Sequence, residues 1–223
     1  MRPTIKKENV KPLFDSEFIK VYDLQYGEGK HYYNASRRDA DSLAAIKSDE
    51  EFKTMLPDAV TCVVVVCIEG KIPRLLLSKE YRYPTGQFLL SPPAGLLDPT
   101  DARTANPVLS AAKREIWEET GLIIKPCDSL SVINPLLFSS PGMTDESNAL
   151  VCAVIHLPGP GMSSLDYLSH DNASGSECFD GFQLVSVKAA KDILKAGIDK
   201  QGVSYSVYTW AALMYFASGL WRK

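Results

Sequence analysis

Apolar residues dominate the stretch from Ala59 to Ile68, and most of them are β-branched. A strand with one buried face alternates apolar and polar positions, so this nearly continuous run predicts a strand covered on both faces, in the centre of a sheet. A turn at 70–71 leads to a second expected strand, Arg74 to Ser78. Strands are also predicted from Leu150 to Ile155 and from Phe182 to Val185.

Helical periodicity replaces this pattern in three places. Pro107 suits a first helical position and Gly121 a C-terminal stop, so a helix is predicted between them. Its apolar residues share one arc at about 100° per residue, and Trp117 lies roughly opposite. Two further helices are expected, Lys188 to Ala196 and Ser204 to Ser218. The latter is apolar around much of its circumference and should pack on the sheet.

The first 56 residues have a different character. Phe14 to Arg38 reads as a hairpin or meander with a turn at 27–29, and 40–55 as a loop with a short helix. We therefore divide the chain into N-terminal strands with a connecting segment, residues 1–56, and a larger domain, residues 57–223.

Composition limits the classes of function. With 223 residues, 45% hydrophobic and a net charge of -3, the chain can bury a sizeable core and has no overall basic bias, so no nucleic-acid partner is expected. Five cysteines without a CxxC pair, mostly in apolar runs, suggest buried free thiols in a reducing cytoplasm. The longest apolar run is about half of what spans a bilayer, so no membrane association is expected.

The end of the predicted helix from Pro107 to Gly121 carries three glutamates beside its apolar arc: Glu115, Glu118 and Glu119. Carboxylates four residues apart repel each other by a few tenths of a kcal/mol even when exposed. An oxygen-preferring cation, Mg²⁺ or alternatively Mn²⁺, would relieve that repulsion and leave room for a phosphate. The alternative for an isolated pair is a solvated acidic turn.

The surrounding order of residues resembles the Nudix box of the Nudix hydrolases. Gly95 matches its opening glycine, and the run from Arg114 to Leu122, Arg-Glu-apolar-x-Glu-Glu-x-Gly-apolar, matches its second half at every fixed position. Two departures fall in the first half. Asp101 stands where the family has a glutamate, and twelve residues separate it from Arg114, five more than in the family pattern. A stretch such as 102–106 is read as an insertion in the loop before the helix.

This resemblance implies an α/β Nudix fold: an α/β/α sandwich with a mixed β-sheet, preceded by N-terminal antiparallel strands. It implies metal ligation by three glutamates and a backbone carbonyl, with Arg114 as their orienting partner and Glu118 sharing in catalysis. The implied ligands are Ala94, Glu115, Glu118 and Glu119.

Two further segments resemble the ADP-ribose pyrophosphatase branch of the family. The segment Glu-Tyr-Arg-x-Pro, before the box, implies a phosphate contact for Arg82, whose planar fork of donors fits phosphoryl oxygens. The alternative is an ion pair between Arg82 and Glu80. The segment Ser-Pro-Gly-x-Thr-x-Glu implies that Glu146 is the general base. Its alternative is a Pro-Gly turn with a solvated acidic end.

In that branch the N-terminal strands often help to form a dimer and offer an aromatic ring and an arginine to the nucleotide. Tyr32 or Tyr33, with Arg37, are the matching candidates, and a homodimer is expected. A ring and a guanidinium suit an adenine and a diphosphate. A cross-strand aromatic pair with exposed arginines is the alternative.

The function implied is metal-dependent hydrolysis of a nucleoside diphosphate linked to another group. ADP-ribose, giving AMP and ribose 5-phosphate, is the leading substrate, and nucleotide sugars and dinucleotides stay open. The competing hypothesis is a catalytically silent Nudix-fold module that binds a nucleotide. The insertion and Asp101 favour that module, whereas the intact stretch from Arg114 to Leu122 favours an enzyme, because clustered carboxylates are costly to keep without a function.

Overall fold

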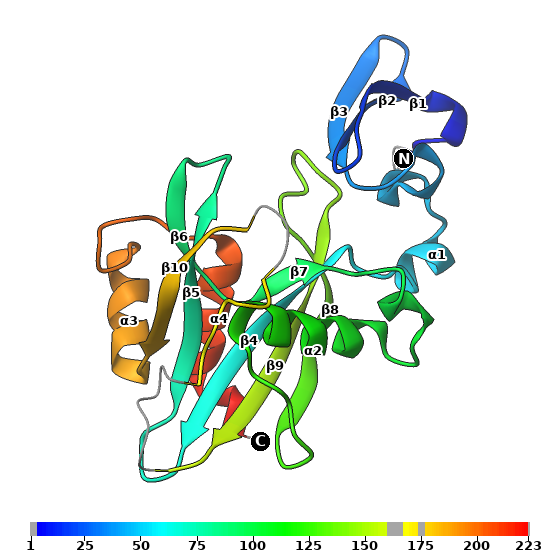
Figure 1. Ribbon diagram of the computed structural model, residues 1–223. Coiled ribbons are helices and arrows are strands. Elements are labelled where there is room, and N and C mark those ends of the chain that lie inside the picture. Colours follow the sequence, from blue (N-terminus) through cyan, green and yellow to red (C-terminus); the bar gives the residue numbers. More distant parts are fainter. Residues whose placement is uncertain (1–3, 160–166, 174–176, 223) are drawn as a thin grey trace. The chain divides into compact units, whose positions relative to one another are not determined.

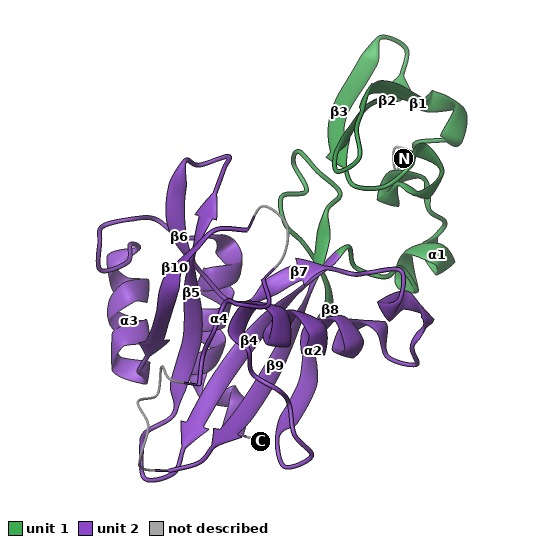
Figure 2. Ribbon diagram, viewed as in Figure 1, with its two compact units in different colours: residues 1–58, 135–148 green, residues 59–134, 149–223 purple. Residues whose placement is uncertain are grey.

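The structure is a computed structural model that describes residues 4–159, 167–173 and 177–222 (Figure 1). The chain forms two compact units, coloured separately in Figure 2. The first unit contains residues 1–58 and 135–148, and the second contains residues 59–134 and 149–223. The chain passes from the first unit to the second after Asp58, and residues 135–148 also belong to the first unit.

A seven-stranded sheet forms the centre of the second unit. Its strand order is β10-β5-β4-β9-β8, with β6 paired to β5 and β7 paired to β4. The pairings β10–β5, β5–β4, β5–β6 and β4–β7 are antiparallel, whereas the arrows of β4 and β9 point the same way in Figure 1, so the sheet is mixed. Its strands are β4 (Ala59–Ile68), β5 (Arg74–Arg82), β6 (Gln87–Ser91), β7 (Ala94–Leu96), β8 (Ser129–Phe138), β9 (Ser147–Leu157) and β10 (Phe179–Val185).

Helices cover both faces of this sheet. The side chains of Ala112 and Ile116 on α2 (Pro107–Thr120) share a core cluster with Val60 and Val64 of β4. Successive strand residues point to opposite faces, so Val63 and Val65 face away from α2, toward the side where α4 (Val207–Ser218) lies in Figure 1. The predictions of a doubly covered β4, of α2 and of the α/β sandwich are confirmed.

The C-terminal part of the second unit is helical. It consists of α3 (Val187–Ala196), α4 and a final 3₁₀ turn, η5 (Leu220–Arg222). Thr209 Oγ1 donates to the carbonyl of Leu90 at 2.6 Å, which ties α4 to β6. Leu213 and Phe216 of α4 are fully buried, as expected, whereas Trp210 and Met214 of the same helix are exposed.

The first unit is a three-stranded antiparallel sheet with short helical turns. The sheet has the order β1-β2-β3 and packs over a small core of Val10, Tyr22, Leu24 and Leu43. The expected hairpin and short helix are present, and β1 begins before the predicted stretch. The elements are η1 (Lys7–Asn9), β1 (Val10–Asp15), β2 (Lys20–Gly27), β3 (Lys30–Ser36), η2 (Ala40–Ser42), η3 (Ala44–Ile46) and α1 (Asp49–Lys53).

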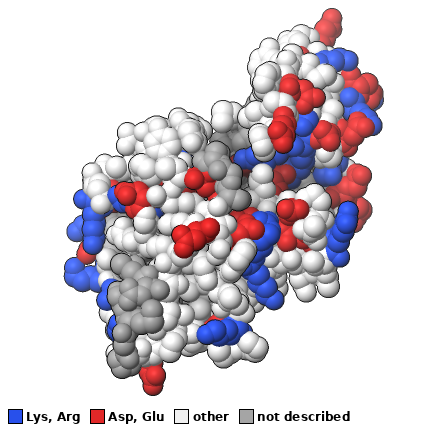
Figure 3. Space-filling model, viewed as in Figure 1, with Lys and Arg blue, Asp and Glu red and all other residues white. Residues whose placement is uncertain are grey.

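The cysteines correct one expectation. All five are free thiols, but Cys127 and Cys178 are exposed rather than buried, because they lie in connecting segments and not in the sheet. Among the described residues, none of the helices has the length and hydropathy that crossing a bilayer would require. On the face drawn in Figure 3, acidic and basic side chains are interspersed over each unit.

Candidate active site

Helix α2 presents the box glutamates to the inside of the second unit. Pro107 occupies the first turn, and Gly121 ends the helix in the left-handed region at φ 72°, where its N–H donates to the carbonyl of Trp117. Because one face of the helix is anchored in the core, the residues beside that face are drawn inward too. Glu115 and Glu119 are only 5% and 2% exposed.

Strand β7 lies directly against these carboxylates. A Cβ added to Gly95 would lie 2.1 Å from Glu115 Oε1, which is closer than a Cβ atom approaches another non-bonded heavy atom in proteins. The N–H of the preceding residue, Ala94, donates to Glu119 Oε1 at 3.1 Å. Gly95 is therefore required by close approach of the backbone and not by its own dihedral angles. Ligation by the Ala94 carbonyl stays a prediction.

Burial disfavours the charged form of both carboxyls. Burial raises the pKa of Glu115 to about 7 against the lowering effect of Arg114. Burial also raises the pKa of Glu119 well above its ordinary value, and the charges of Glu80 and Glu177 act in the same direction. Carboxyls perturbed by burial and by one another are typical of a site that binds a cation or performs chemistry.

Arg114 organises the polar side of α2. Its Nη1 donates to Glu115 Oε1 at 2.7 Å and to Glu118 Oε2 at 3.0 Å, and its Nη2 donates to the carbonyl of Leu96 at 2.8 Å. The predicted orienting partner of the glutamates is thus in contact with two of them. Glu118 is the more accessible of the two, with 24% of its side chain exposed.

Asp101, whose role the sequence left open, completes the contacts of Arg114. It lies in the 3₁₀ turn η4 (Asp101–Arg103), is 3% exposed, and accepts from Arg114 Nη2 at 2.9 Å. Burial acts to raise the pKa of Asp101, but hydrogen bonds from Arg114 and from the N–H of Asp98 lower it below its ordinary value. Residues 102–106, read as the insertion, form the rest of this turn and the link to α2, and the carboxylate of Asp101 lies beside Arg114.

The donor set fits a divalent cation. Within the described part of the chain, no three His, Cys, Asp or Glu side chains are already gathered as a metal site, and Arg114 holds Glu115 and Glu118 instead. The buried, mutually repelling oxygens of Glu115 and Glu119, beneath a backbone that lacks a Cβ at Gly95, are nevertheless the hard ligands that Mg²⁺ and Mn²⁺ prefer.

Arg82, the predicted phosphate ligand, is paired in this structure with Glu80. Its Nη2 lies 2.5 Å from Glu80 Oε2, and 43% of the arginine side chain is exposed. Burial raises the pKa of Glu80. The charge of Arg82 acts to lower this pKa, and the charge of Glu177 acts to raise it further. The ion pair foreseen as the alternative is therefore present, and phosphate contact by Arg82 stays a prediction.

Two residues near the box carried little signal in the sequence. Glu177 lies two residues before β10, and its charge raises the pKa of Glu80, Glu115 and Glu119. The only sequence signal was an acidic residue at the end of a polar stretch. This placement makes Glu177 a further candidate for the site.

The second such residue is His170. Its Nδ1–H donates to the carbonyl of Glu119 at 2.7 Å, and its ring stacks on Phe179 and Phe182 with centroids 4.3 and 3.8 Å apart. Burial lowers the pKa of His170. The ring thereby fastens the last turn of α2 to β10, a role that no local pattern announces.

The remaining predicted residues lie in the first unit. Arg37 Nε donates to Glu146 Oε1 at 2.7 Å, so the structure brings the candidate nucleotide ligand and the candidate base together. Tyr32 donates to the carbonyl of Gly142 at 2.7 Å, and Tyr33 is 63% exposed. Across the ladder Tyr32 faces Leu24 and Tyr33 faces Asp23, so neither makes the cross-strand aromatic pair considered as the alternative.

An α/β sandwich whose central helix carries buried carboxylates, with an arginine bridging them, defines the class of protein. The NUDIX domain matches residues 55–202, more than half of the chain. The chain therefore belongs to the Nudix family. Members of this family are hydrolases that generally use divalent cations.

Individual relatives cover parts of the chain. An uncharacterised Nudix hydrolase of Schizosaccharomyces pombe is 34% identical over 103 residues, 46% of this chain and 45% of the relative. The ADP-ribose pyrophosphatase of Saccharomyces cerevisiae is 32% identical over 92 residues, 41% of this chain and 36% of the relative. Each match spans less than half of the relative's length.

The fold as a whole is similar to a solved one. A crystal structure of an ADP compounds hydrolase superposes with a TM-score of 0.57 at 18% identity, covering 99% of this chain and 95% of that chain. At this identity the likeness supports the fold.

Proposed function

We propose that this protein is a metal-dependent diphosphatase that cleaves ADP-ribose to AMP and ribose 5-phosphate. The single observation that carries the proposal is the pair of buried carboxyls, Glu115 and Glu119, with raised pKa values beneath the close backbone of Gly95. The similarity to an ADP-ribose pyrophosphatase supports the choice of substrate. Nucleotide sugars are the next class to test.

Glu115, Glu118 and Glu119, with the carbonyl of Ala94, would hold the cation. We expect Mg²⁺, with Mn²⁺ as the alternative. When bound, it would supply positive charge to the phosphate oxygens and lower the barrier to attack on a diphosphate. Arg114 would keep the glutamates oriented as the charge in the site changes.

The protein's own residues would bind substrate and move the proton. Arg82 and Arg37 would each donate to phosphate oxygens, and Tyr32 or Tyr33 would stack on the adenine. Glu146 would accept a proton from the attacking water as the new P–O bond forms and the bridging P–O bond breaks, releasing two phosphate monoesters. Glu177 is the competing base, because its charge acts on Glu115 and Glu119.

A catalytically silent module is the weaker alternative. Its strongest support was the altered first half of the box. Asp101 nevertheless bonds to Arg114, so the shorter acidic residue keeps a buried contact to the arginine that holds Glu115 and Glu118. This observation favours an enzyme.

We also propose that the protein is a cytoplasmic homodimer that pairs through its N-terminal strands. Large apolar side chains are exposed on β1 and on the β1–β2 turn, with exposed fractions of 57% at Leu13, 55% at Phe14 and 66% at Phe18. Such side chains are commonly covered by a partner. The five free thiols suit a reducing compartment.

Release of AMP from ADP-ribose tests the function. The purified protein would be assayed with Mg²⁺, with Mn²⁺ and with chelator, beside Glu119→Gln and a panel of nucleotide sugars. Glu50→Gln, an exposed glutamate of α1, is the matched control. Cation-dependent turnover lost only in Glu119→Gln supports the proposal. Turnover of another compound alone would change the substrate, and nucleotide binding without turnover would favour the silent module.

A further inference from the structure

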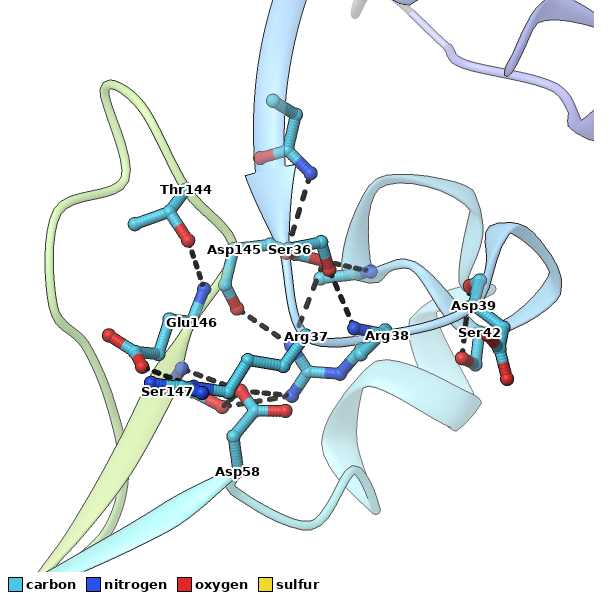
Figure 4. Close-up of polar contacts among 12 residues, drawn as sticks. Ser36, Arg37, Arg38, Asp39, Ser42, Asp58, Thr144, Asp145, Glu146 and Ser147 are labelled. Carbon is cyan, nitrogen blue, oxygen red and sulfur yellow. Dashed lines mark hydrogen bonds and ion pairs between the residues drawn. The ribbon is translucent and has the colours of Figure 1, made fainter. Parts of the chain in front are cut away.

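Two neighbouring basic residues face two neighbouring acidic residues in the first unit (Figure 4). The end of β3 runs parallel to the loop that precedes β9: Ala35 bridges Thr144, and the N–H of Ala35 donates to the carbonyl of Met143 at 3.0 Å. Beyond this bridge, Ser36 is followed by Arg37-Arg38 in one segment, and Thr144 by Asp145-Glu146 in the other. Each arginine contacts a different acidic residue.

Arg38 points inward and makes several contacts at once. Its Nη2 lies 2.8 Å from Asp58 Oδ2 and donates to Ser147 Oγ at 3.0 Å, and its Nη1 donates to the carbonyl of Asp145 at 2.7 Å. Only 10% of the arginine side chain is exposed. A planar guanidinium can satisfy three such acceptors together, whereas an ammonium presents its charge at one point.

The acceptors of Arg38 are themselves fixed. Asp58 Oδ2 accepts from the N–H of Ser147 at 2.8 Å and from its hydroxyl at 3.0 Å. Asp145 Oδ2 accepts from the N–H of Ala44 at 3.0 Å. Arg38 therefore joins β3, the residue before β4, and the loop before β9 into one buried polar network, which we call the Arg38 network: Arg38, Asp58, Asp145 and Ser147.

Arg37 is the more exposed of the two arginines and contacts the other acidic residue of the pair. Its Nε donates to Glu146 Oε1 at 2.7 Å, with 38% of the arginine side chain and 30% of the glutamate side chain exposed. A guanidinium has further donors on its two terminal nitrogens. Arg37 can thus hold Glu146 and contact a phosphate in the same position.

We propose that Arg38 is a positioning residue that fixes the register of these two segments and so brings the candidate base, Glu146, against the candidate phosphate ligand, Arg37. The inference rests on the proposed function. A slip by one residue would exchange the partners, placing Arg38 against Glu146 and Arg37 against Asp145. The Arg38 network opposes that exchange, because Arg38 would lose its contacts with Asp58 and Ser147 if it turned toward Glu146.

The chemistry of the network favours a role in register over one in stability alone. Buried ion pairs are often matched or surpassed in stability by apolar side chains of similar size, and fixing a register is their best-attested use. An apolar residue at position 38 would bury the same volume but could not distinguish Asp145 from its neighbour.

The test combines a conservative variant with a charge-balanced one. Arg38→Lys keeps the positive charge and loses the planar guanidinium. The double variant Arg38→Met with Asp58→Asn removes one charge of each sign and leaves no unpaired charge at Asp58. The second variant serves for the test if the first does not fold. Lys20→Met is the matched control, because Lys20 is a largely buried cation of the same unit, 16% exposed, that pairs with Asp15 and Asp39. Turnover of ADP-ribose is measured for each, alone and combined with Glu146→Gln.

If Arg38 acts through Glu146, its variants lower kcat at least about tenfold in the wild-type background and less than about twofold when Glu146 is already Gln. Lys20→Met leaves kcat unchanged. An equal fractional loss in both backgrounds would show a general structural effect and overturn the proposal. So would a normal kcat for Glu146→Gln alone, since Arg38 would then have no base to position.

Hydrogen exchange separates failure of this inference from failure of the proposed function. If the wild-type protein cleaves none of the compounds, the proposed function fails, and exchange of the amides of residues 143–147 decides on the positioning. Exchange about tenfold faster in Arg38→Lys than in Lys20→Met, with β4 amides unchanged, supports the role of Arg38. Unchanged exchange in that segment overturns it.

Discussion

Asp101 accepts a hydrogen bond from Arg114 at 2.9 Å across the additional residues that separate them in sequence. Asp101 is buried, and the guanidinium of Arg114 also donates hydrogen bonds to Glu115 and Glu118. The position of two box glutamates therefore depends on a carboxylate outside the helix. Asp101 therefore still provides a carboxylate partner for Arg114, although it replaces the glutamate of the family pattern and lies five residues farther from the arginine in sequence.

Asp101→Asn should lower both stability and kcat. Arg114 would lose one of its charged partners, because a neutral amide would replace the carboxylate that accepts from Arg114 and from the N–H of Asp98. We expect a loss of about 2–3 kcal/mol in the free energy of unfolding, typical of a buried hydrogen bond to a charged group. Urea unfolding and AMP release measure the two effects. Asp101→Glu restores the charge, and activity equal to wild type in Asp101→Asn would contradict the orienting role.

Gly95→Ala should abolish most of the activity. The new methyl group would lie 2.1 Å from the Glu115 carboxylate, so β7 or Glu115 must move. We expect kcat to fall at least about a hundredfold, because small misplacements of catalytic groups have effects of that size, and stability to fall by about 1–3 kcal/mol. Gly142→Ala is the control, since a Cβ there meets no atom within 4 Å. Similar kinetics for both variants would exclude a special requirement at position 95.

Glu146 and Glu177 can be separated as candidates for the general base. Loss of a general base typically costs about 10²–10⁴ in rate. We expect Glu146→Gln to lower kcat by that factor with little change in KM. Glu177→Gln should have the smaller effect on kcat, and a shift in the Mg²⁺ concentration required would mark it as part of the cation site. If the larger loss of kcat falls on Glu177→Gln, the base is Glu177.

Asp128 should make stability depend on pH in the acid range. Burial acts to raise the pKa of Asp128, but hydrogen bonds from the N–H groups of His156 and Lys125 lower it below its ordinary value. Its contribution to stability is therefore complete above the unfolded pKa, near 3.8, and is lost as the pH falls through the lower folded pKa. Asp128→Asn should cost about 1–2 kcal/mol at pH 7.

The measurement for Asp128 is urea unfolding at pH 7 and again below pH 3.8. The difference between wild type and Asp128→Asn should narrow at the lower pH. Asp192→Asn is the control, because Asp192 makes an exposed pair with Lys188 on α3. A difference that stays constant with pH would show that Asp128 acts through packing and not through its charge.

The features that the sequence predicted best are those encoded locally. Strand β4 follows from a nearly continuous apolar run that is mostly β-branched, and α2 follows from a helical period between Pro107 and Gly121. The burial of Glu115 and Glu119 also follows from their place beside the apolar arc.

The features that it missed depend on contacts between distant segments. Asp101 could be aligned but not assigned a partner, because its distance from Arg114 is set by how the intervening turn folds. His170 reaches Glu119 across 51 positions, and Arg38 reaches Ser147 across 109. No periodicity or capping signal records such pairs. Glu177 is a similar case, because Glu80 and Glu119, whose pKa values its charge raises, lie in other elements.

The discontinuity of the first unit has a consequence for biosynthesis. Residues 1–58 leave the ribosome early, but their partners in the Arg38 network lie in 135–148, after the strands β4 to β7 and helix α2. Until those residues emerge, Arg38 and Asp58 lack Asp145 and Ser147. Closing so long a loop is slow and must await the later segment. The Arg38 network of a nascent chain therefore forms only after strands β4 to β7 and helix α2 have been made, and truncation before residue 135 should yield a first unit that lacks this network.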